Sequence, residues 1–306
     1  KKFGFTGLVI TDALNMKGVS DYSGNESASL RSFLAGADLL LIPDNLSLAF
    51  ADIRNALISG VITEERLAYS VKKILSAKYE MKLHQTKTVN TDNLKVDLQT
   101  PDFSVLQHKL AEASLTVIRN EDKLLPIQNL EDSQIAYVSI GEDSGEFFLD
   151  RLQHYSSIDQ QALSEILSTK NDYSHVIVGL HQPDHSPFVN HKLSSDLISK
   201  LDLLCKKFDV ILVTFANPYT ISKLPLEKCK SVVIAYQNNP IFQSKAAQLV
   251  FGGLGANGKL PVSVGRYPQG SGIDIAPLGR LSYGHPKQVG MDENVLEIVD
   301  LMATRA

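Results

Sequence analysis

The sequence predicts an α/β protein made of two unequal parts. Near its start, an apolar run at 8–11 is followed by a helical pattern that ends at Gly36 and by a second apolar run at 39–42. This order of strand, helix and strand is typical of βα units and of a parallel sheet. Further along, apolar segments rich in β-branched residues alternate with helical patterns. These segments are 135–140, 175–180, 209–215 and 231–236.

Composition excludes several classes of protein. The chain has 306 residues, enough for about two domains, and 43% of them are apolar. A formal net charge of −4, without a stripe of Lys and Arg among aromatic residues, argues against nucleic acid as a partner. No apolar stretch approaches the roughly 18 residues of a membrane span. We therefore expect a solvated, mildly acidic surface, no nucleic-acid partner and no span.

The domain boundaries follow from changes in pattern. Residues 1–83 hold the first βα units, in which Thr63 is suited to cap a helix. Residues 84–103 are polar and weakly patterned, as in a linker, and residues 104–275 suit one doubly wound α/β domain that could fold alone. Residues 276–306 read as a tail or linker. Without an initiator Met and with a strand so near its start, the chain is expected to be a piece of a longer protein.

Asp12 is the main candidate for chemistry. It directly follows the apolar run of "GLVITDA", which has the composition of a strand buried on both faces. An ionised carboxylate is costly to bury unless it is paired, so Asp12 lies at a strand mouth, forms a salt bridge or takes part in catalysis. Catalytic groups of parallel barrels lie at the carboxyl ends of strands. A helix cap or a salt bridge is an equally good interpretation from position alone.

Two short motifs fail on their context. "GLGANGK", from Gly253 to Lys259, matches part of a phosphate loop, but Leu260 replaces the Ser or Thr that holds magnesium, and a helix precedes it instead of a strand. We interpret it as a glycine-rich connection. "SVKK", from Ser70 to Lys73, matches the Ser-x-x-Lys of penicillin-recognising enzymes without the partner motifs, which indicates a surface helix.

Polar loops follow three of the later strands. One contains His181, Asp184, His185 and His191, which are residue types that bind zinc, but Pro183 argues against the helix that an H-x-x-x-H spacing needs. The loops at 216–219 and 237–240 end two other strands, so the three loops are predicted to line one crevice. It could bind a small molecule or face the other domain. We expect no metal and no cofactor.

Cys205 and Cys229 are the only cysteines. Two are too few for a disulfide scaffold or a thiolate zinc site. Two buried thiols are the first expectation, with a single disulfide as the alternative.

Four segments, in order, resemble glycoside hydrolase family 3 in its β-N-acetylhexosaminidase branch. "GFTGLVITDALNMKGVS" is similar to the nucleophile segment of that family, and "AGADLLLIPDN" to its next strand. "AEASLTVIRNEDKLLPI" and "QLVFGGLGANGKLPVSV" are similar to the entry and the closing segment of its second domain. The β-glucosidase branch usually has Trp after the nucleophile, whereas Ala13 follows Asp12 here, which favours the hexosaminidase branch.

The resemblance implies a fold and a mechanism. Residues 1–83 would be the C-terminal fragment of a (β/α)8 catalytic barrel, that is a partial TIM barrel, followed by an α/β/α sandwich domain at 104–275. Family members retain the anomeric configuration, and Asp12 matches the nucleophile. The acid/base, an Asp-His pair in the hexosaminidase branch, lies on an earlier barrel loop and is not present in this chain. The isolated chain is therefore expected to be inactive.

The resemblance also implies partners and a location. The substrate would be a terminal N-acetyl-β-hexosaminide, with N-acetylglucosamine from peptidoglycan as the family's expected case, in the periplasm or cell envelope. The missing N-terminal barrel portion of the same protein would be the chain's other partner. The tail at 276–306 resembles the linker by which some members continue into a serine β-lactamase-like domain.

Two rival interpretations come from other classes. The chain could be a non-catalytic α/β scaffolding or interaction module whose His-rich loop faces a partner. It could also be a metal-dependent hydrolase at the His181 loop.

Overall fold

The structure is a computed structural model that describes residues 4–23, 27–85, 88–183 and 193–305. The chain divides into two compact units, Lys1–Asp92 and Asn93–Ala306, which are described separately below. The boundary between them falls inside the polar segment 84–103.

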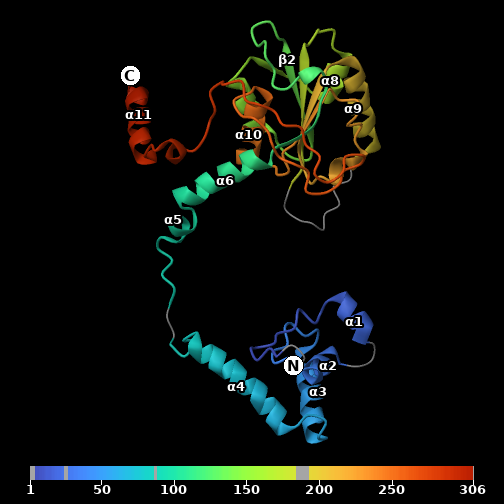
Figure 1. Ribbon diagram of the computed structural model, residues 1–306, viewed down its shortest axis with the longest axis vertical. Helices are drawn as coiled ribbons and strands as arrows, with labels where there is room; N and C mark the ends of the chain where they lie inside the picture. The colour runs from blue at the N-terminus through green and yellow to red at the C-terminus, as the bar shows by residue number, and fades with distance from the viewer. Residues whose placement is uncertain (1–3, 24–26, 86–87, 184–192, 306) are drawn as a thin grey trace. The chain divides into compact units, whose positions relative to one another are not determined.

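Unit 1 is mainly helical. The helices of its described residues are α1 (Lys17–Ser23), α2 (Ala28–Ala35), α3 (Leu46–Ile58) and α4 (Glu64–Glu80), and a short turn joins the last two (Figure 1). Three helices begin at side-chain caps, since Ser27, Asn45 and Thr63 each accept a hydrogen bond from a backbone N–H of the first turn. Gly36, with φ of 113°, ends α2 in the left-handed conformation that glycine adopts without strain. The loop after Asp12 thus contains a helix, α1, that its sequence does not suggest.

The strand-like runs of unit 1 pair only once. Ile10 and Leu39 form an isolated parallel bridge, with no longer ladder among the described residues. Val9 and Ile10 are 39% and 53% exposed, so the predicted burial on both faces is wrong for this unit as it stands. The reason is physical: a parallel strand is buried only when further strands and helices cover it. The buried apolar cluster of the unit is small, with Phe33, Ala56 and Ile62 at its centre.

Unit 2 holds a six-stranded sheet with helices around it. The strands are β1 (Thr116–Asn120), β2 (Ile135–Gly141), β3 (Ile158–Gln160), β4 (His175–His181), β5 (Val210–Phe215) and β6 (Ser231–Ile234). The helices are α5 (Leu94–Leu98), α6 (Pro101–Ser114), α7 (Glu146–Gln153), α8 (Leu163–Ser168), α9 (Ser195–Lys207), α10 (Pro240–Val250) and α11 (Glu293–Arg305). Three short 3₁₀ turns complete it: η1 (Glu121–Lys123), η2 (Thr220–Lys223) and η3 (Pro286–Val289).

The sheet is mixed. Its strand order is β1-β6-β5-β4-β2-β3, in which β1 pairs antiparallel with β6 and all other neighbours are parallel. The predicted α/β class is confirmed, with one antiparallel edge strand added. Along the chain, β3 is placed on one side of β2 and β4 on the other, so the order reverses between β2 and β4. In such sheets this reversal opens a crevice at the carboxyl ends of the strands.

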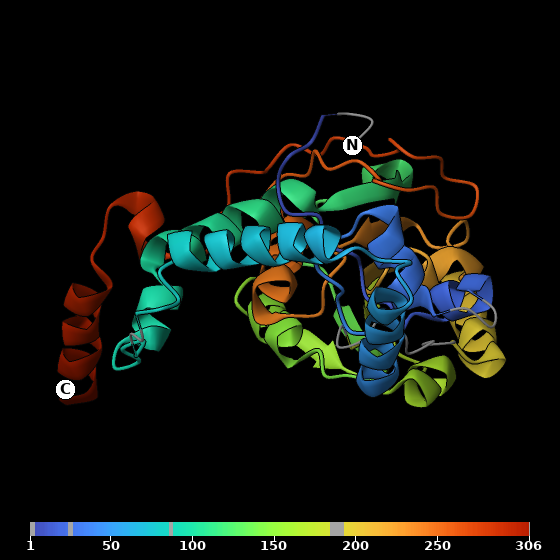
Figure 2. The ribbon, with the colours of Figure 1, turned by 90° about the horizontal axis from the view of Figure 1, so that it is seen from below.

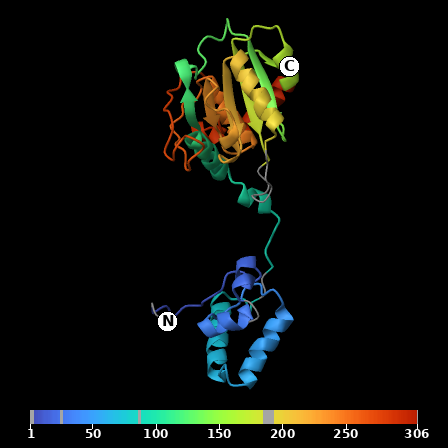
Figure 3. The same cartoon turned by 90° about the vertical axis from the view of Figure 1, so that its right-hand side faces the viewer.

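Alternate residues of each central strand face opposite sides of the sheet. Tyr137 and Ile177 pack with Phe148 of α7 and with α10, whereas Val138 and Val178 pack with α8 and α9. Figure 1 shows α10 and α9 on either side of the strands, and in Figure 3 the yellow helix α9 crosses the front of the sheet. Because successive side chains of a strand enter different cores, a shift of one residue would move every side chain to the wrong face, and this fixes the register of the strands.

The segment after α10 runs across unit 2 without a helix until η3 (Figure 2). Arg280 anchors it, because its guanidinium donates hydrogen bonds to the carbonyls of Ile127, Gln128 and Phe251 at 2.5 to 2.8 Å. The apolar segment 260–264 forms no strand, and Val264 makes an isolated bridge to Tyr267. Among the described residues, no helix combines the length and apolar character that crossing a bilayer requires.

Candidate functional site

Asp12 lies in a backbone segment that is fixed on both sides. The Thr11 amide donates to the Leu39 carbonyl at 3.1 Å, and the Leu14 amide donates to the Leu41 carbonyl at 2.9 Å. The Thr11 hydroxyl also accepts the Leu41 amide at 2.9 Å. Asp12 is thus held at the end of the first strand-like run by backbone pairing with the second.

The Asp12 side chain is exposed. Its Oδ1 accepts a hydrogen bond from the adjacent Ala13 amide at 2.8 Å. Within the described part of unit 1, Asp12 forms no salt bridge with another described residue, so the salt-bridge interpretation has no support there. A carboxylate with a fixed backbone and an open face can meet a ligand from solvent.

Asp38, unlike Asp12, is a buried acid, and no sequence pattern marked it as a candidate. Its side chain is 2% exposed and is bound by Lys73 Nζ at 2.5 Å and by the Ser70 hydroxyl at 2.6 Å. The Val9 amide donates to Oδ2, the oxygen that Lys73 also binds, at 3.0 Å, and Arg66 Nη1 lies 3.8 Å from Oδ1. The carboxylate thereby ties α4 to both strand-like runs.

These contacts set the protonation of Asp38. Burial alone would raise the pKa of Asp38, but hydrogen bonds from Lys73, Ser70 and the Val9 amide outweigh it and lower that pKa to about 2. Asp38 is therefore ionised at neutral pH, and its carboxylate is buried among groups of unit 1 that bind it. It is a structural acid.

The Ser-x-x-Lys match at 70–73 is part of the same network. Ser70 is 1% exposed and not on the helix surface, so the surface-helix interpretation is wrong for it. Arg66 Nη1 donates a hydrogen bond to the Ser70 hydroxyl at 2.5 Å, and that hydroxyl donates one to Asp38 Oδ1 at 2.6 Å. The spacing places Ser70 and Lys73 one helical turn apart, where both reach one carboxylate.

In unit 2, side chains from β2, from β4 and from the loops that follow β2 and β6 form one hydrogen-bond network. The Tyr137 hydroxyl lies 2.9 Å from His181 Nε2, and His181 Nδ1 lies 2.8 Å from Asn238 Oδ1. The Asn238 amide nitrogen donates to Asp143 at 2.8 Å. Because Asn238 Oδ1 can only accept, Nδ1 of His181 carries the proton, and Nε2 accepts from Tyr137.

His181 is neutral and fully buried. Burial lowers the pKa of His181 to about 4, although Asn238 and Asp143 act in the other direction. Both ring nitrogens are used inside the unit, so His181 offers none to a metal ion. Asp184, His185 and His191 lie outside the described residues, and the described ones hold no group of three potential ligands.

The loops after β5 and β6 line a cavity of about 560 Å³ with Asp143. Asn217 and Pro218 come from the first loop, and Tyr236 to Asn239 from the second. This crevice lies at the carboxyl edge that strand order predicts, and its walls are mostly amides. The residues that line it all belong to unit 2, whereas Asp12 belongs to unit 1.

The glycine-rich segment ending at Lys259 is structural. Lys259 Nζ binds Asp274 at 2.7 Å and the Gly272 carbonyl at 2.8 Å. A side chain at Gly258 would meet the Leu115 carbonyl at 2.5 Å, so the glycine permits a close backbone approach.

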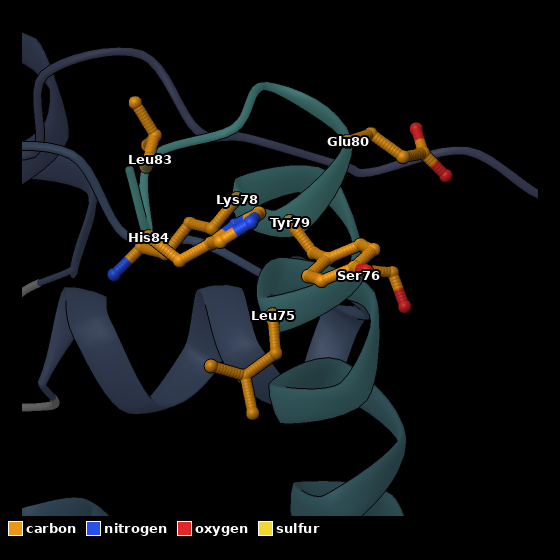
Figure 4. A pocket seen from close by; sticks show the side chains of 7 residues that line it. All are labelled: Leu75, Ser76, Lys78, Tyr79, Glu80, Leu83 and His84. Atoms are coloured by element: carbon orange, nitrogen blue, oxygen red, sulfur yellow. The ribbon is translucent and has the colours of Figure 1, made fainter. Parts of the chain in front are cut away.

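An apolar pocket of about 690 Å³ lies at the end of α4 (Figure 4). Leu75 and Leu83 line it with Tyr79 and His84, whose rings stack with centroids 4.6 Å apart. The residues that line it belong to the last turns of α4 and to the segment directly after this helix.

The comparisons with known proteins identify the class. Residues 1–77 match the family model described as "Glycosyl hydrolase family 3 N terminal domain". The matched residues include Asp12 and nearly all of unit 1. The predicted resemblance of this chain to glycoside hydrolase family 3 is confirmed.

Two curated relatives carry hexosaminidase names. The chain is 24% identical over 262 residues to a "Beta-N-acetylglucosaminidase/beta-glucosidase" of Cellulomonas fimi, covering 78% of this chain and 46% of the relative. It is 28% identical over 165 residues to "Beta-hexosaminidase A" of Pseudoalteromonas piscicida, covering 51% and 27%. The chain thus spans less than half the length of either relative.

Solved structures support the fold. A family 3 β-N-acetylglucosaminidase from Paenibacillus sp. str. FPU-7 matches with a TM-score of 0.62 and 22% identity, over 86% of this chain and 52% of that one. A β-glucosidase from Listeria innocua matches with a TM-score of 0.68 and 15% identity, over 86% and 41%. Hexosaminidases and β-glucosidases thus share this fold.

Proposed function

We propose that this chain is part of a retaining glycoside hydrolase that cleaves terminal N-acetyl-β-hexosaminides, with Asp12 as the nucleophile. The observation that carries the proposal is the contrast of two acids in the unit that matches the family 3 domain. Asp38 is buried and fully engaged, whereas Asp12 is exposed on a backbone fixed by Leu39 and Leu41. A nucleophilic carboxylate needs that combination of a fixed position and open lone pairs.

The reaction would proceed by double displacement. The Asp12 carboxylate attacks the anomeric carbon and forms a glycosyl-enzyme, while a second group protonates the leaving oxygen. That group then removes a proton from the water that releases the sugar. By the resemblance, this acid/base belongs to an earlier barrel loop outside the chain, so the chain alone would be inactive.

Unit 1 would be the end of a (β/α)8 barrel. Its apolar residues are exposed where a barrel would cover them: Ile10 in the first run, Phe50 of α3 and Leu75 of α4. A barrel closes its parallel strands against one another and its helices against neighbouring helices. The N-terminal portion of the same protein is the occupant that we propose for these faces, with unit 2 as the α/β sandwich domain that follows.

The preference for N-acetylated sugars rests on two supports. Ala13 follows Asp12 where the β-glucosidase branch usually has Trp, and two relatives carry hexosaminidase names. The second candidate is a β-glucosidase, favoured by the second half of the name of the Cellulomonas fimi relative. Peptidoglycan fragments in the cell envelope remain the expected substrate by resemblance.

The test uses the complete parent protein and this chain side by side. Asp12→Ala in the parent should lower turnover of a chromogenic N-acetyl-β-glucosaminide by about 10³-fold or more, because the covalent step is lost. The far-ultraviolet circular dichroism should not change, since Asp12 is exposed. A fluorosugar inactivator should label the peptide that contains Asp12.

Four outcomes would decide against parts of the proposal. Labelling of another residue would remove Asp12 from its role, and faster turnover of a β-glucoside would favour the second candidate. Turnover by the isolated chain, abolished by Asp12→Asn, would contradict its inactivity. A parent that binds no sugar but binds a protein through unit 2 would favour the scaffolding module.

A further inference from the structure

The two cysteines meet inside unit 2. Cys205 lies in the last turn of α9 and is half-buried, whereas Cys229 precedes β6 and is fully buried. Their Sγ atoms are 2.9 Å apart, and both are free thiols. Cys229 belongs to the core that α9 covers, and Cys205 packs against that core.

We propose that Cys205 and Cys229 are an oxidative modification site, which takes up a low-molecular-weight disulfide as oxidant and becomes an intramolecular disulfide. The geometry carries this proposal, because the sulfur atoms already touch and both sides belong to one packed core. A disulfide bond needs the sulfur atoms about 2 Å apart, so a shift of about 1 Å suffices. The proposal does not depend on Asp12 or on the reaction proposed above.

The two thiols differ in access. Cys229 is enclosed, and its hydrogen bond with Cys205, together with burial, raises the pKa of the Cys229 thiol. Cys205 is reachable from solvent, whereas Cys229 is not. A solvated oxidant therefore meets Cys205 first, so Cys205 attacks first and Cys229 resolves.

With oxidised glutathione as the oxidant, the exchange balances in two steps. Cys205 loses a proton, and its thiolate attacks one glutathione sulfur, which forms a mixed disulfide and releases one glutathione thiolate. Cys229 then loses its proton and attacks Cys205 Sγ, which releases the second glutathione thiolate. Two protein thiols are oxidised, one glutathione disulfide is reduced to two thiols, and the two protons pass to the released thiolates.

The bond would join the end of α9 to the entry of β6. It would link positions 24 residues apart and so restrict the unfolded chain. We expect the oxidised chain to melt about 5–10 °C above the reduced chain, given the size of unit 2.

The test compares the full chain after reduction by a phosphine with the same chain after equilibration with oxidised glutathione. Each sample is denatured in acid, alkylated with N-ethylmaleimide and weighed by intact mass spectrometry. The reduced chain should take two labels, and the oxidised chain none while staying monomeric without bound glutathione. Cys205→Ser, at the half-buried position, should keep the fold and show no rise in melting temperature on oxidation.

Specific results would overturn the proposal. One is a wild-type chain that still takes two labels after oxidation; another is a stable glutathione adduct or a disulfide-linked dimer as the end product. An equal melting shift in Cys205→Ser would also overturn it, because that variant cannot form the internal bond. Asp12→Asn should oxidise like the wild type, which separates this test from that of the proposed function.

Discussion

The helices of both units form by the same local capping and periodicity, but the apolar side chains of unit 1 are much less buried than those of unit 2. In unit 2, Phe148 of α7 is 0% exposed between the sheet and its neighbours, whereas Phe50 of α3 in unit 1 is 68% exposed. Both lie on well-formed helices. The comparison teaches that helix caps and periodicity determine the elements, while burial requires enough elements to surround each apolar side chain.

Truncating these two phenylalanines should give the largest difference. Phe148→Ala removes a ring that contacts Tyr137 and Phe215 at centroid distances of 5.6 and 5.1 Å, so it should lower the free energy of unfolding by about 3–5 kcal/mol. Phe50→Ala should change it by less than about 0.5 kcal/mol, because little packing is lost. Urea unfolding followed by circular dichroism measures both, and equal losses would refute the contrast.

Within unit 1, the two acids should separate as sharply. Asp38→Asn leaves Lys73 and Arg66 without their carboxylate, which should destabilise the unit by about 3 kcal/mol. Asp12→Asn is the matched control and should be neutral for stability. Hydrogen exchange of the α4 amides reports on this unit alone; protection that survives in Asp38→Asn would show that the network does not hold α4.

The units should also lose stability in different pH ranges. In unit 2, the folded pKa of His181 is about 4 and its ordinary value is 6.5, so the unfolded chain binds the extra proton first as pH falls. Its contribution, about 3 kcal/mol, should be complete above pH 6.5 and lost between pH 6.5 and 4. In unit 1, the folded pKa of Asp38 is about 2 against 3.8, so about 2 kcal/mol should be lost between pH 4 and 2.

Unfolding at a series of pH values checks both windows. The variant His181→Gln should flatten the upper window, and Asp38→Asn the lower one. A lower window that persists in Asp38→Asn would assign it to another group.

The smallest effect should be the same in both units. Thr63 accepts the Arg66 amide at 3.1 Å at the start of α4, and Ser194 accepts the Leu197 amide at 3.1 Å at the start of α9. Replacing either by Ala should cost about 1 kcal/mol, since a cap acts locally. A much larger loss at one of them, measured by denaturant unfolding, would indicate a long-range role for that residue.

The sequence predicted what depends on local pattern. The strands 135–140, 175–180 and 209–215, the cap at Thr63 and the helix end at Gly36 are all present, because periodicity and capping are encoded within a few residues. β3 went unrecognised because it has three residues, two of them polar. No pattern marks a short edge strand of that kind.

The candidate site was predictable in part. Asp12 follows an apolar run and was found by position, whereas Asp38, which sits after one alanine in "GADLL", has no local signal that it binds Lys73 35 residues later. His181 was noted for metal chemistry, but its partners, Tyr137 of β2 and Asn238 of the loop after β6, lie far apart in sequence. Only the sheet order brings them together.

The hydrogen bonds of Ser70 show why a match to a short motif does not by itself indicate a catalytic serine. A serine acts as a nucleophile and becomes acylated when a neighbouring general base, which has a free lone pair, accepts the proton of its hydroxyl. Here the neighbouring Lys73 nitrogen is held by Asp38, and the serine proton is itself shared with that carboxylate. Lys73 is thus not available as a general base for Ser70. A β-lactam should therefore leave Ser70 unmodified, even though residues 70–73 match the Ser-x-x-Lys motif.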